Sequence, residues 1–188
     1  MSDRALLGAI VGTIILFIAS LAVAITATQT NPSIGEGFVT LFKDAILGEI
    51  NGDTPAILAL KVFLNNLQAC LLLFLGGASL GVLTAFVLAA NGLVIGAIIE
   101  VVREQKGLVF VLAAIAPHGI FEVPAFVIAG ALGFLLAREL WRDLQGREDA
   151  GVGAMRLGRY FLTIVVPLIA VAAIIEAFIT PEIIQLLA

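Results

Sequence analysis

The sequence predicts an all-α fold: a polytopic transmembrane helical bundle with about five crossings and an interfacial amphipathic helix. Of the 188 residues, 61% are hydrophobic and only 13% are charged, about half the charged share of an average soluble domain. The mean hydropathy is +1.16, and several charge-free runs reach the roughly 20 residues that a membrane-spanning helix needs. We therefore expect residues 1–188 to form a single integral membrane domain.

The same composition excludes several classes of protein. A monomer this apolar would expose large hydrophobic patches to water, and disorder requires low hydrophobicity, so a soluble enzyme and a disordered chain are both excluded. The net charge of −4 gives no basic surface for nucleic acid. A single cysteine, Cys70, and a single histidine, His118, exclude an internal disulfide and a four-ligand Cys/His zinc site. We expect no cofactor, and we expect the lipid bilayer and other membrane proteins as partners.

The first predicted helix covers about residues 5–28. No residue from Ala5 to Gly35 is charged, and this run is longer than the apolar region of a signal peptide, about 7–15 residues. We therefore expect a retained crossing that ends at the Thr-Gln-Thr-Asn-Pro segment, since proline cannot continue a helix.

Residues 31–55 mix charged residues and glycines with apolar residues at helical spacing. This pattern predicts an amphipathic helix on the membrane surface, and a helix packed over the mouth of the bundle is the alternative. The apolar positions are Phe38, Leu41, Phe42, Ala45, Ile46 and Ile50.

The next apolar section holds two crossings. From Val62 to Ile99 no residue is charged, and a helix of that length would measure about 57 Å, nearly twice the hydrocarbon thickness. We place the turn at Gly76-Gly77 and consider a second break at Asn91-Gly92. A polar cluster at residues 103–107 ends the section.

The last third of the chain holds one or two further crossings before the final one. The apolar stretch 108–137 contains three predicted helix breaks, Pro117, Gly119 and Pro124. A break there could raise the total for the chain to six crossings, or it could form a re-entrant half-helix. Residues 138–159 form a charged loop in this prediction, and 160–179 form the last crossing.

Basic residues predict the orientation. The 138–159 loop carries five arginines, half of the 10 Lys and Arg residues, so the positive-inside rule places it in the cytoplasm together with Arg4 and the N-terminus. Five crossings then leave the C-terminus outside, in a multi-pass protein of the cell membrane. Arg103 and Lys106 would lie on the outer side, which counts against this orientation.

Glycines recur four residues apart, the spacing that lets helix backbones approach closely in lipid. We expect these pairs to pack a compact bundle or to form the seam of a homodimer. The pairs are Gly8 with Gly12, Gly77 with Gly81, and Gly92 with Gly96.

Polar side chains inside the apolar spans are the candidate functional residues, because an ionisable group in mid-bilayer costs about 2.5–3.5 kcal/mol. We predict that seven of them form a buried polar network: His118, Glu122, Glu176, Lys61, Asn65, Asn66 and Asn91. Gln68 and Glu100 also lie near these spans, and we assign Glu100 to the membrane interface.

His118 and Glu122 are four residues apart, so a continuous helix places them on one face. They could form a proton-transfer or ion-binding site, or a satisfied pair that only fixes the packing. Together with Glu176 they could also bind a divalent metal, since imidazole and carboxylate ligate several such ions. The sequence leaves the metal question open.

Lys61 and Glu176 are expected at similar depth near the outer side. We predict an ion pair between them with Asn65 as a third member, and the alternative is that Lys61 extends alone to the interface.

Catalytic patterns do not match this chain. A zincin needs two histidines, and the serines within spans, Ser20 and Ser79, lie in no recognisable motif. We therefore expect no catalytic residues and no enzymatic activity.

Several segments between residues 63 and 181 together resemble the stage II sporulation protein M family of integral membrane proteins. The resemblance implies a membrane core without a hydrolase domain, because sporulating members are scaffolds that anchor partners which remodel peptidoglycan. The matching segments are Phe63-Leu64-Asn65-Asn66, Gly76 to Gly81, Asn91-Gly92-x-x-x-Gly96, Pro117-His118-Gly119-x-x-Glu122-x-Pro124-Ala125 and Ile174-Ile175-Glu176-Ala177-Phe178-x-Thr180-Pro181.

The sequence therefore predicts a non-enzymatic membrane scaffold or partner-anchoring protein. The alternative is a small ion- or proton-coupled transporter or channel that uses His118, Glu122 and Glu176.

Overall fold

The computed structural model describes residues 3–46, 54–147 and 149–186, and of residues 41–46 it describes the backbone only. Within these ranges every regular element is a helix, which confirms the all-α prediction. The elements in order are α1 (Asp3–Thr30), α2 (Pro32–Ile46), α3 (Pro55–Leu75), the short 3₁₀ helix η2 (Gly76–Ser79), α4 (Val82–Lys106), α5 (Leu108–Leu144), α6 (Ala150–Tyr160), the π-helical turn η3 (Phe161–Val165), α7 (Val166–Phe178) and α8 (Thr180–Gln185).

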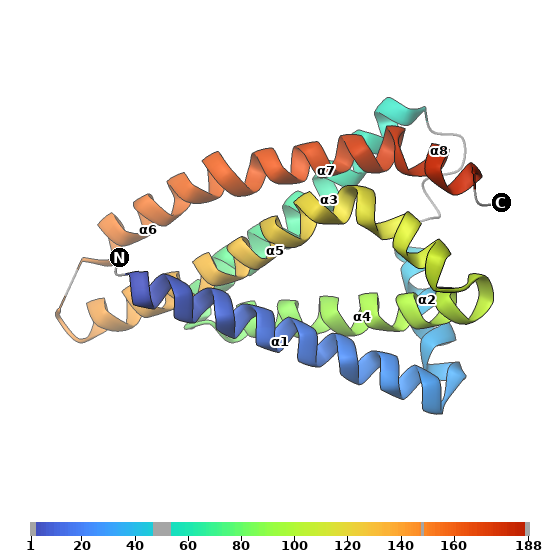
Figure 1. The fold of residues 1–188 in the computed structure, drawn as a ribbon. Coiled ribbons are helices and arrows are strands. Elements are labelled where there is room, and N and C mark those ends of the chain that lie inside the picture. Colours follow the sequence, from blue (N-terminus) through green and yellow to red (C-terminus); the bar gives the residue numbers. More distant parts are fainter. Residues whose placement is uncertain (1–2, 47–53, 148, 187–188) are drawn as a thin grey trace.

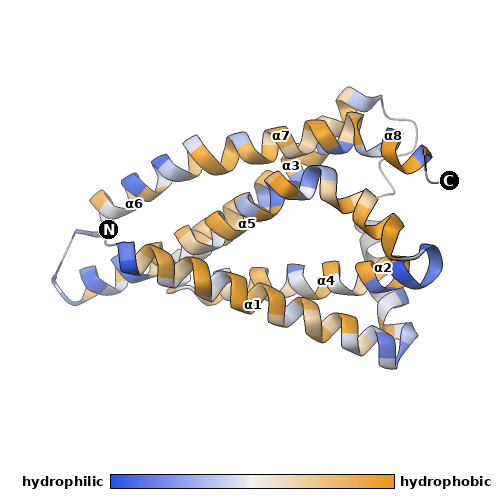
Figure 2. Cartoon of the chain, in the orientation of Figure 1, coloured by the Kyte–Doolittle hydropathy of each residue, from blue (hydrophilic) through white to orange (hydrophobic). Residues whose placement is uncertain are grey.

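Five helical segments of the described chain are long and apolar enough to cross a membrane, as predicted. They are α1, α3 with η2, α4, α5, and the run from α6 to α8. Hydrophilic residues gather towards the ends of these helices, and the sections between them are mostly hydrophobic (Figure 2). The described chain therefore has five candidate crossings, and the stretch 108–137 does not supply a sixth, because it forms one continuous helix.

The crossings alternate between two ends of the molecule (Figure 1). The N-terminus, η2 and the connection from α5 to α6 lie at one end, which we call the N-terminal end. The helix α2, the connection from α4 to α5 and the C-terminus lie at the other, the C-terminal end. This arrangement agrees with the prediction that the N-terminus and the 138–159 segment share one side of the membrane and the C-terminus lies on the other. Which of the two sides faces the cytoplasm stays a prediction.

Local sequence explains where α3 and α4 begin and end. The side chain of Thr54 accepts a hydrogen bond from the backbone N–H of Ile57 at 3.4 Å, and Pro55 occupies the first turn of α3. After η2 the chain turns through Leu80 and Gly81, both with positive φ, and Gly107 at φ +84° ends α4. The turn thus lies within residues 76–81, close to the predicted position.

The second break predicted at Asn91-Gly92 is wrong, because α4 is continuous there. The Asn91 side-chain amide donates to the carbonyl oxygen of Val87 at 2.8 Å, within the same helix. Gly92 packs against α1, where an added Cβ would overlap Ser20. Its small size serves the contact between the two helices and does not interrupt α4.

The predicted breaks in residues 108–137 are also wrong, since α5 runs without interruption through Pro117, Gly119 and Pro124. Each proline removes one backbone hydrogen bond, which bends a helix without ending it when neighbouring helices support the turn. A pronounced bend in the first half of α5 is visible in Figure 1. No separate half-helix forms in this stretch.

The charged 138–159 segment is mostly helix rather than loop. The helix α5 continues to Leu144, α6 begins at Ala150, and α6, η3 and α7 follow one another directly. Leucine, arginine and glutamate favour helix, so the charged residues extend both helices beyond the apolar sections. Most of the segment predicted as a long loop is therefore helical, since α5 ends only at Leu144 and α6 begins at Ala150.

The helix α2 crosses the ends of α1 and α4 at the C-terminal end (Figure 1). A Cβ added at Gly35 would overlap Thr28 of α1 and meet Val101 of α4 at 2.6 Å. This contact favours a helix packed over the bundle mouth. Of the predicted apolar positions, the side chains of Leu41, Phe42, Ala45 and Ile46, together with Ile50, lie outside the described residues.

Close helix contacts depend on glycine at three of the predicted positions. Gly92 and Gly96 of α4 pack against α1, and a Cβ at Gly77 would overlap the backbone of Gly133 in α5. Gly81 instead provides the positive φ at the start of α4. Gly8 and Gly12 have no atom within 4 Å of an added Cβ, so no close packing of the described chain requires glycine at these two positions.

Candidate functional site

The candidate site is a cluster of three ionisable side chains on two crossings. His118 and Glu122 lie one helical turn apart on α5, and Glu176 lies near the end of α7. One ligand atom from each lies within 4.8 Å of the others, and Nε2 of His118 is 3.8 Å from a carboxylate oxygen of Glu122. We call these three residues the His–Glu–Glu cluster.

The start of α8 orients the histidine of this cluster. The buried hydroxyl of Thr180 lies 3.4 Å from Nδ1 of His118, and it donates to the carbonyl oxygen of Ile175 at 3.4 Å. In the tautomer that carries its proton on Nδ1, the imidazole donates to the Thr180 hydroxyl oxygen. In that tautomer the lone pair of Nε2, 3.8 Å from a carboxylate oxygen of Glu122, is available to a metal ion.

The cluster lies at the flank of the bundle rather than in its sealed core. The side chain of His118 is 14% exposed and that of Glu122 is 31% exposed, while Glu176 is partly buried. Two carboxylates within a few ångströms repel each other unless a proton or a cation is shared between them. The arrangement can therefore exchange protons or bind a cation.

The other members of the predicted network occupy different surroundings. Asn65 is exposed on α3, one amide nitrogen of Asn66 is buried without a hydrogen-bond partner, and Asn91 bonds within α4. Among the described residues no hydrogen bond or ion pair joins these asparagines to the cluster. The predicted Lys61–Glu176 ion pair stays a prediction.

Two buried acidic residues were not recognised in the sequence as paired sites. Glu100 is 1% exposed and receives two hydrogen bonds from Arg103, at 2.8 and 2.5 Å. Glu139 is 6% exposed and lies 3.9 Å from Arg156 of α6. The three-residue spacing of Glu100 and Arg103 could have indicated the first pair, whereas the second joins two helices and left no local signal.

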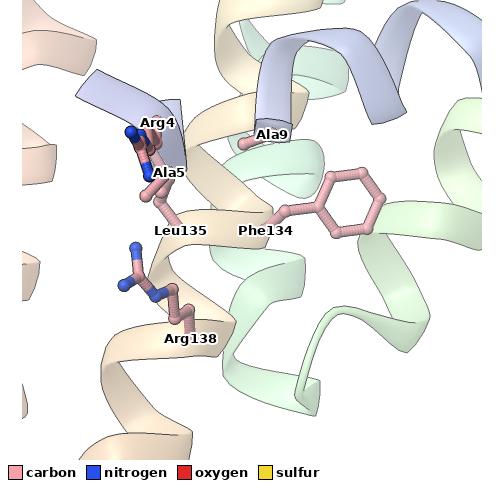
Figure 3. A pocket seen from close by; sticks show the side chains of 6 residues that line it. All are labelled: Arg4, Ala5, Ala9, Phe134, Leu135 and Arg138. Atoms are coloured by element: carbon pink, nitrogen blue, oxygen red, sulfur yellow. The ribbon is translucent and has the colours of Figure 1, made fainter. Parts of the chain in front are cut away.

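A separate pocket of about 450 Å³ lies at the N-terminal end, beside the first turns of α1. Arg4 and Arg138 border it together with apolar side chains (Figure 3). The His–Glu–Glu cluster adjoins α8 at the C-terminal end, so this pocket is no part of the candidate site. The other residues that line the pocket are Ala5, Ala9, Phe134 and Leu135.

The five apolar crossings with ionisable groups on two of them define a multi-pass helical membrane protein. The family model described as Stage II sporulation protein M matches residues 9–181, nearly the whole chain. The chain belongs to this family, as the motifs in its sequence indicated.

Among curated proteins, the chain is similar to an uncharacterized protein of Methanocaldococcus jannaschii. The two are 30% identical over 126 residues, which cover 65% of this chain and 71% of the relative. No solved structure matches the chain.

Proposed function

We propose that this chain is a non-enzymatic membrane scaffold that pairs with a second copy of itself. The observation that carries this proposal is a pair of exposed amides, Asn65 and Gln68, near the middle of the apolar helix α3. They share one face of the helix with exposed leucines. We call this surface the α3 outer face, and it consists of Leu64, Asn65, Gln68, Leu71 and Leu72.

An amide exposed to hydrocarbon lacks the hydrogen bonds that water would supply. Asparagine and glutamine each carry both a donor and an acceptor, so two copies of one face can satisfy each other across a twofold axis. Such bonds between transmembrane helices contribute about 0.6–2 kcal/mol each. A second copy is therefore a well-matched occupant of the α3 outer face.

The scaffold role also draws on the family. Its sporulation members anchor partner proteins in the membrane, and close packing at Gly77, Gly92 and Gly96 gives this chain a rigid frame for such a role. We place the N-terminal end, with its arginines, in the cytoplasm, where it would face cytoplasmic partners.

Cysteine cross-linking tests the proposal, because the native Cys70 is buried and should react little. We expect Leu72→Cys in proteoliposomes to give a species of twice the chain mass with a short bismaleimide. Val23→Cys on α1, whose native side chain is 60% exposed, is the matched control and should give far less.

The contribution of Asn65 and Gln68 to the pairing is tested in the Leu72→Cys variant. Adding Asn65→Leu and Gln68→Leu to Leu72→Cys should reduce the cross-linked fraction severalfold, because the apolar area is kept while the hydrogen bonds are lost. Equal cross-linking with and without the amides would overturn the proposed pairing. Cross-linking no greater at residue 72 than at residue 23 would overturn it too.

The His–Glu–Glu cluster favours a second candidate function, an ion- or proton-coupled transporter. For a transporter, the Glu122→Gln variant should fold yet lose flux in proteoliposomes. For a scaffold, the same variant should alter stability while no flux is present in either protein.

A further inference from the structure

Three atoms with available lone pairs converge in the His–Glu–Glu cluster. Nδ1 of His118 lies 3.4 Å from the Thr180 hydroxyl, Nε2 lies 3.8 Å from a carboxylate oxygen of Glu122, and a carboxylate oxygen of Glu176 completes the group within 4.8 Å. A histidine held through its second nitrogen by a polar group is the arrangement found around bound metals. The two carboxylates beside the imidazole repel each other unless a proton or a cation lies between them.

We propose that His118, Glu122 and Glu176 bind one divalent transition-metal cation such as Zn²⁺ or Mn²⁺. Ligand bonds of about 2.0–2.2 Å place neighbouring ligand atoms about 3–3.5 Å apart. The ligand atoms of the cluster, which lie within 4.8 Å of one another, therefore need to approach by up to about 1–2 Å, and glutamate side chains can rotate that far without backbone movement. An imidazole with two carboxylates suits a first-row transition metal better than Mg²⁺ or Ca²⁺, which prefer oxygen ligands alone.

The position of the cluster adds two expectations. Because the ligands come from α5 and α7, the bound cation joins two crossings that are far apart in sequence. The partial exposure of Glu122 leaves a side on which water can complete the coordination and through which the ion can arrive. Binding should therefore raise the thermal stability of the bundle.

Metal binding is measured directly on the purified full-length chain in detergent after treatment with a chelator. We expect equilibrium dialysis with Zn²⁺ or Mn²⁺ to give one bound ion per chain and a higher melting temperature, with much weaker binding of Mg²⁺. Absence of bound transition metal at micromolar concentrations, or equal binding of Mg²⁺, would overturn the proposal.

Variants locate the site. Glu176→Gln should lower the affinity by more than about tenfold, because loss of a supporting partner alone typically costs about 10–100-fold. Glu182→Gln on the neighbouring α8 is the matched control and should bind as the unaltered chain does. Equal loss in both variants would show diffuse binding by surface carboxylates and would contradict the site.

The partly exposed Glu122 provides a second variant if Glu176→Gln does not fold. Glu122→Gln should elute as the unaltered chain does and lose both the bound ion and the metal-dependent rise in melting temperature. Retention of both by this folded variant would equally contradict the proposal.

Discussion

Thr84 links the start of α4 to the end of α3 through a buried hydrogen bond. Its side chain is fully buried, and its hydroxyl donates to the carbonyl oxygen of Leu73 at 2.8 Å across the η2 turn. An added Cβ at Gly76 or Gly133 would lie within 3 Å of that hydroxyl oxygen. One small polar side chain therefore fills the space where α3, α4 and α5 meet.

We expect Thr84→Val to lower the free energy of unfolding in detergent by about 1–3 kcal/mol, because the shape is kept while the hydrogen bond to Leu73 is lost in the buried turn. Thr163→Val is the matched control. Its hydroxyl also donates to a backbone carbonyl at 2.8 Å, but on the exposed surface. A similar fall in the free energy of unfolding in both variants would show that burial of the hydrogen bond does not explain the destabilisation by Thr84→Val.

At the scale of the helices, the contact between α1 and α4 depends on glycine. A Cβ at Gly92 would overlap the Ser20 side chain and lie 3.0 Å from the carbonyl oxygen of Phe17. Backbones that pack this closely cannot separate without losing van der Waals contact along the seam.

We expect Gly92→Ala to destabilise the protein by about 1–3 kcal/mol through overpacking. Gly12→Ala is the control, because nothing lies within 4 Å of its Cβ and alanine favours helix by about 1 kcal/mol. Thermal melts of the two variants in one detergent provide the comparison. A Gly92→Ala variant as stable as Gly12→Ala would contradict the tight seam.

At the scale of the whole molecule, the distribution of basic residues predicts the direction of the bundle in the membrane. The arginines Arg4, Arg138 and Arg147 lie towards the N-terminal end, whereas Arg103 and Lys106 lie at the C-terminal end of α4. By the positive-inside rule, the end with more arginine and lysine residues faces the cytoplasm, so we expect the N-terminal end to lie there.

We expect a membrane-impermeant maleimide to label Glu104→Cys in intact cells and to label Arg147→Cys only after permeabilisation. Both native side chains are exposed at opposite ends of the bundle, and the native Cys70 is buried, so each signal reports one end. Labelling of Arg147→Cys in intact cells, with Glu104→Cys labelled only after permeabilisation, would show that the protein has the opposite orientation.

About five crossings, and the chain segments that share each end, followed from the sequence, because hydrocarbon thickness fixes how many apolar residues a helix needs. The sequence left a sixth crossing open, and the continuity of α5 decided against it. The same one-dimensional pattern placed His118 and Glu122 on one helix face. Local signals misled at Pro117, Pro124 and Asn91, since each could end an isolated helix.

Only the tertiary structure decided which polar groups meet. Glu176 reaches His118 and Glu122 because α7 packs beside α5 and the start of α8 brings Thr180 to the histidine. Neighbouring helices also support the backbone at the prolines, so α5 bends and continues. Such contacts depend on how helices pack around one another, which residue spacing along one helix does not specify.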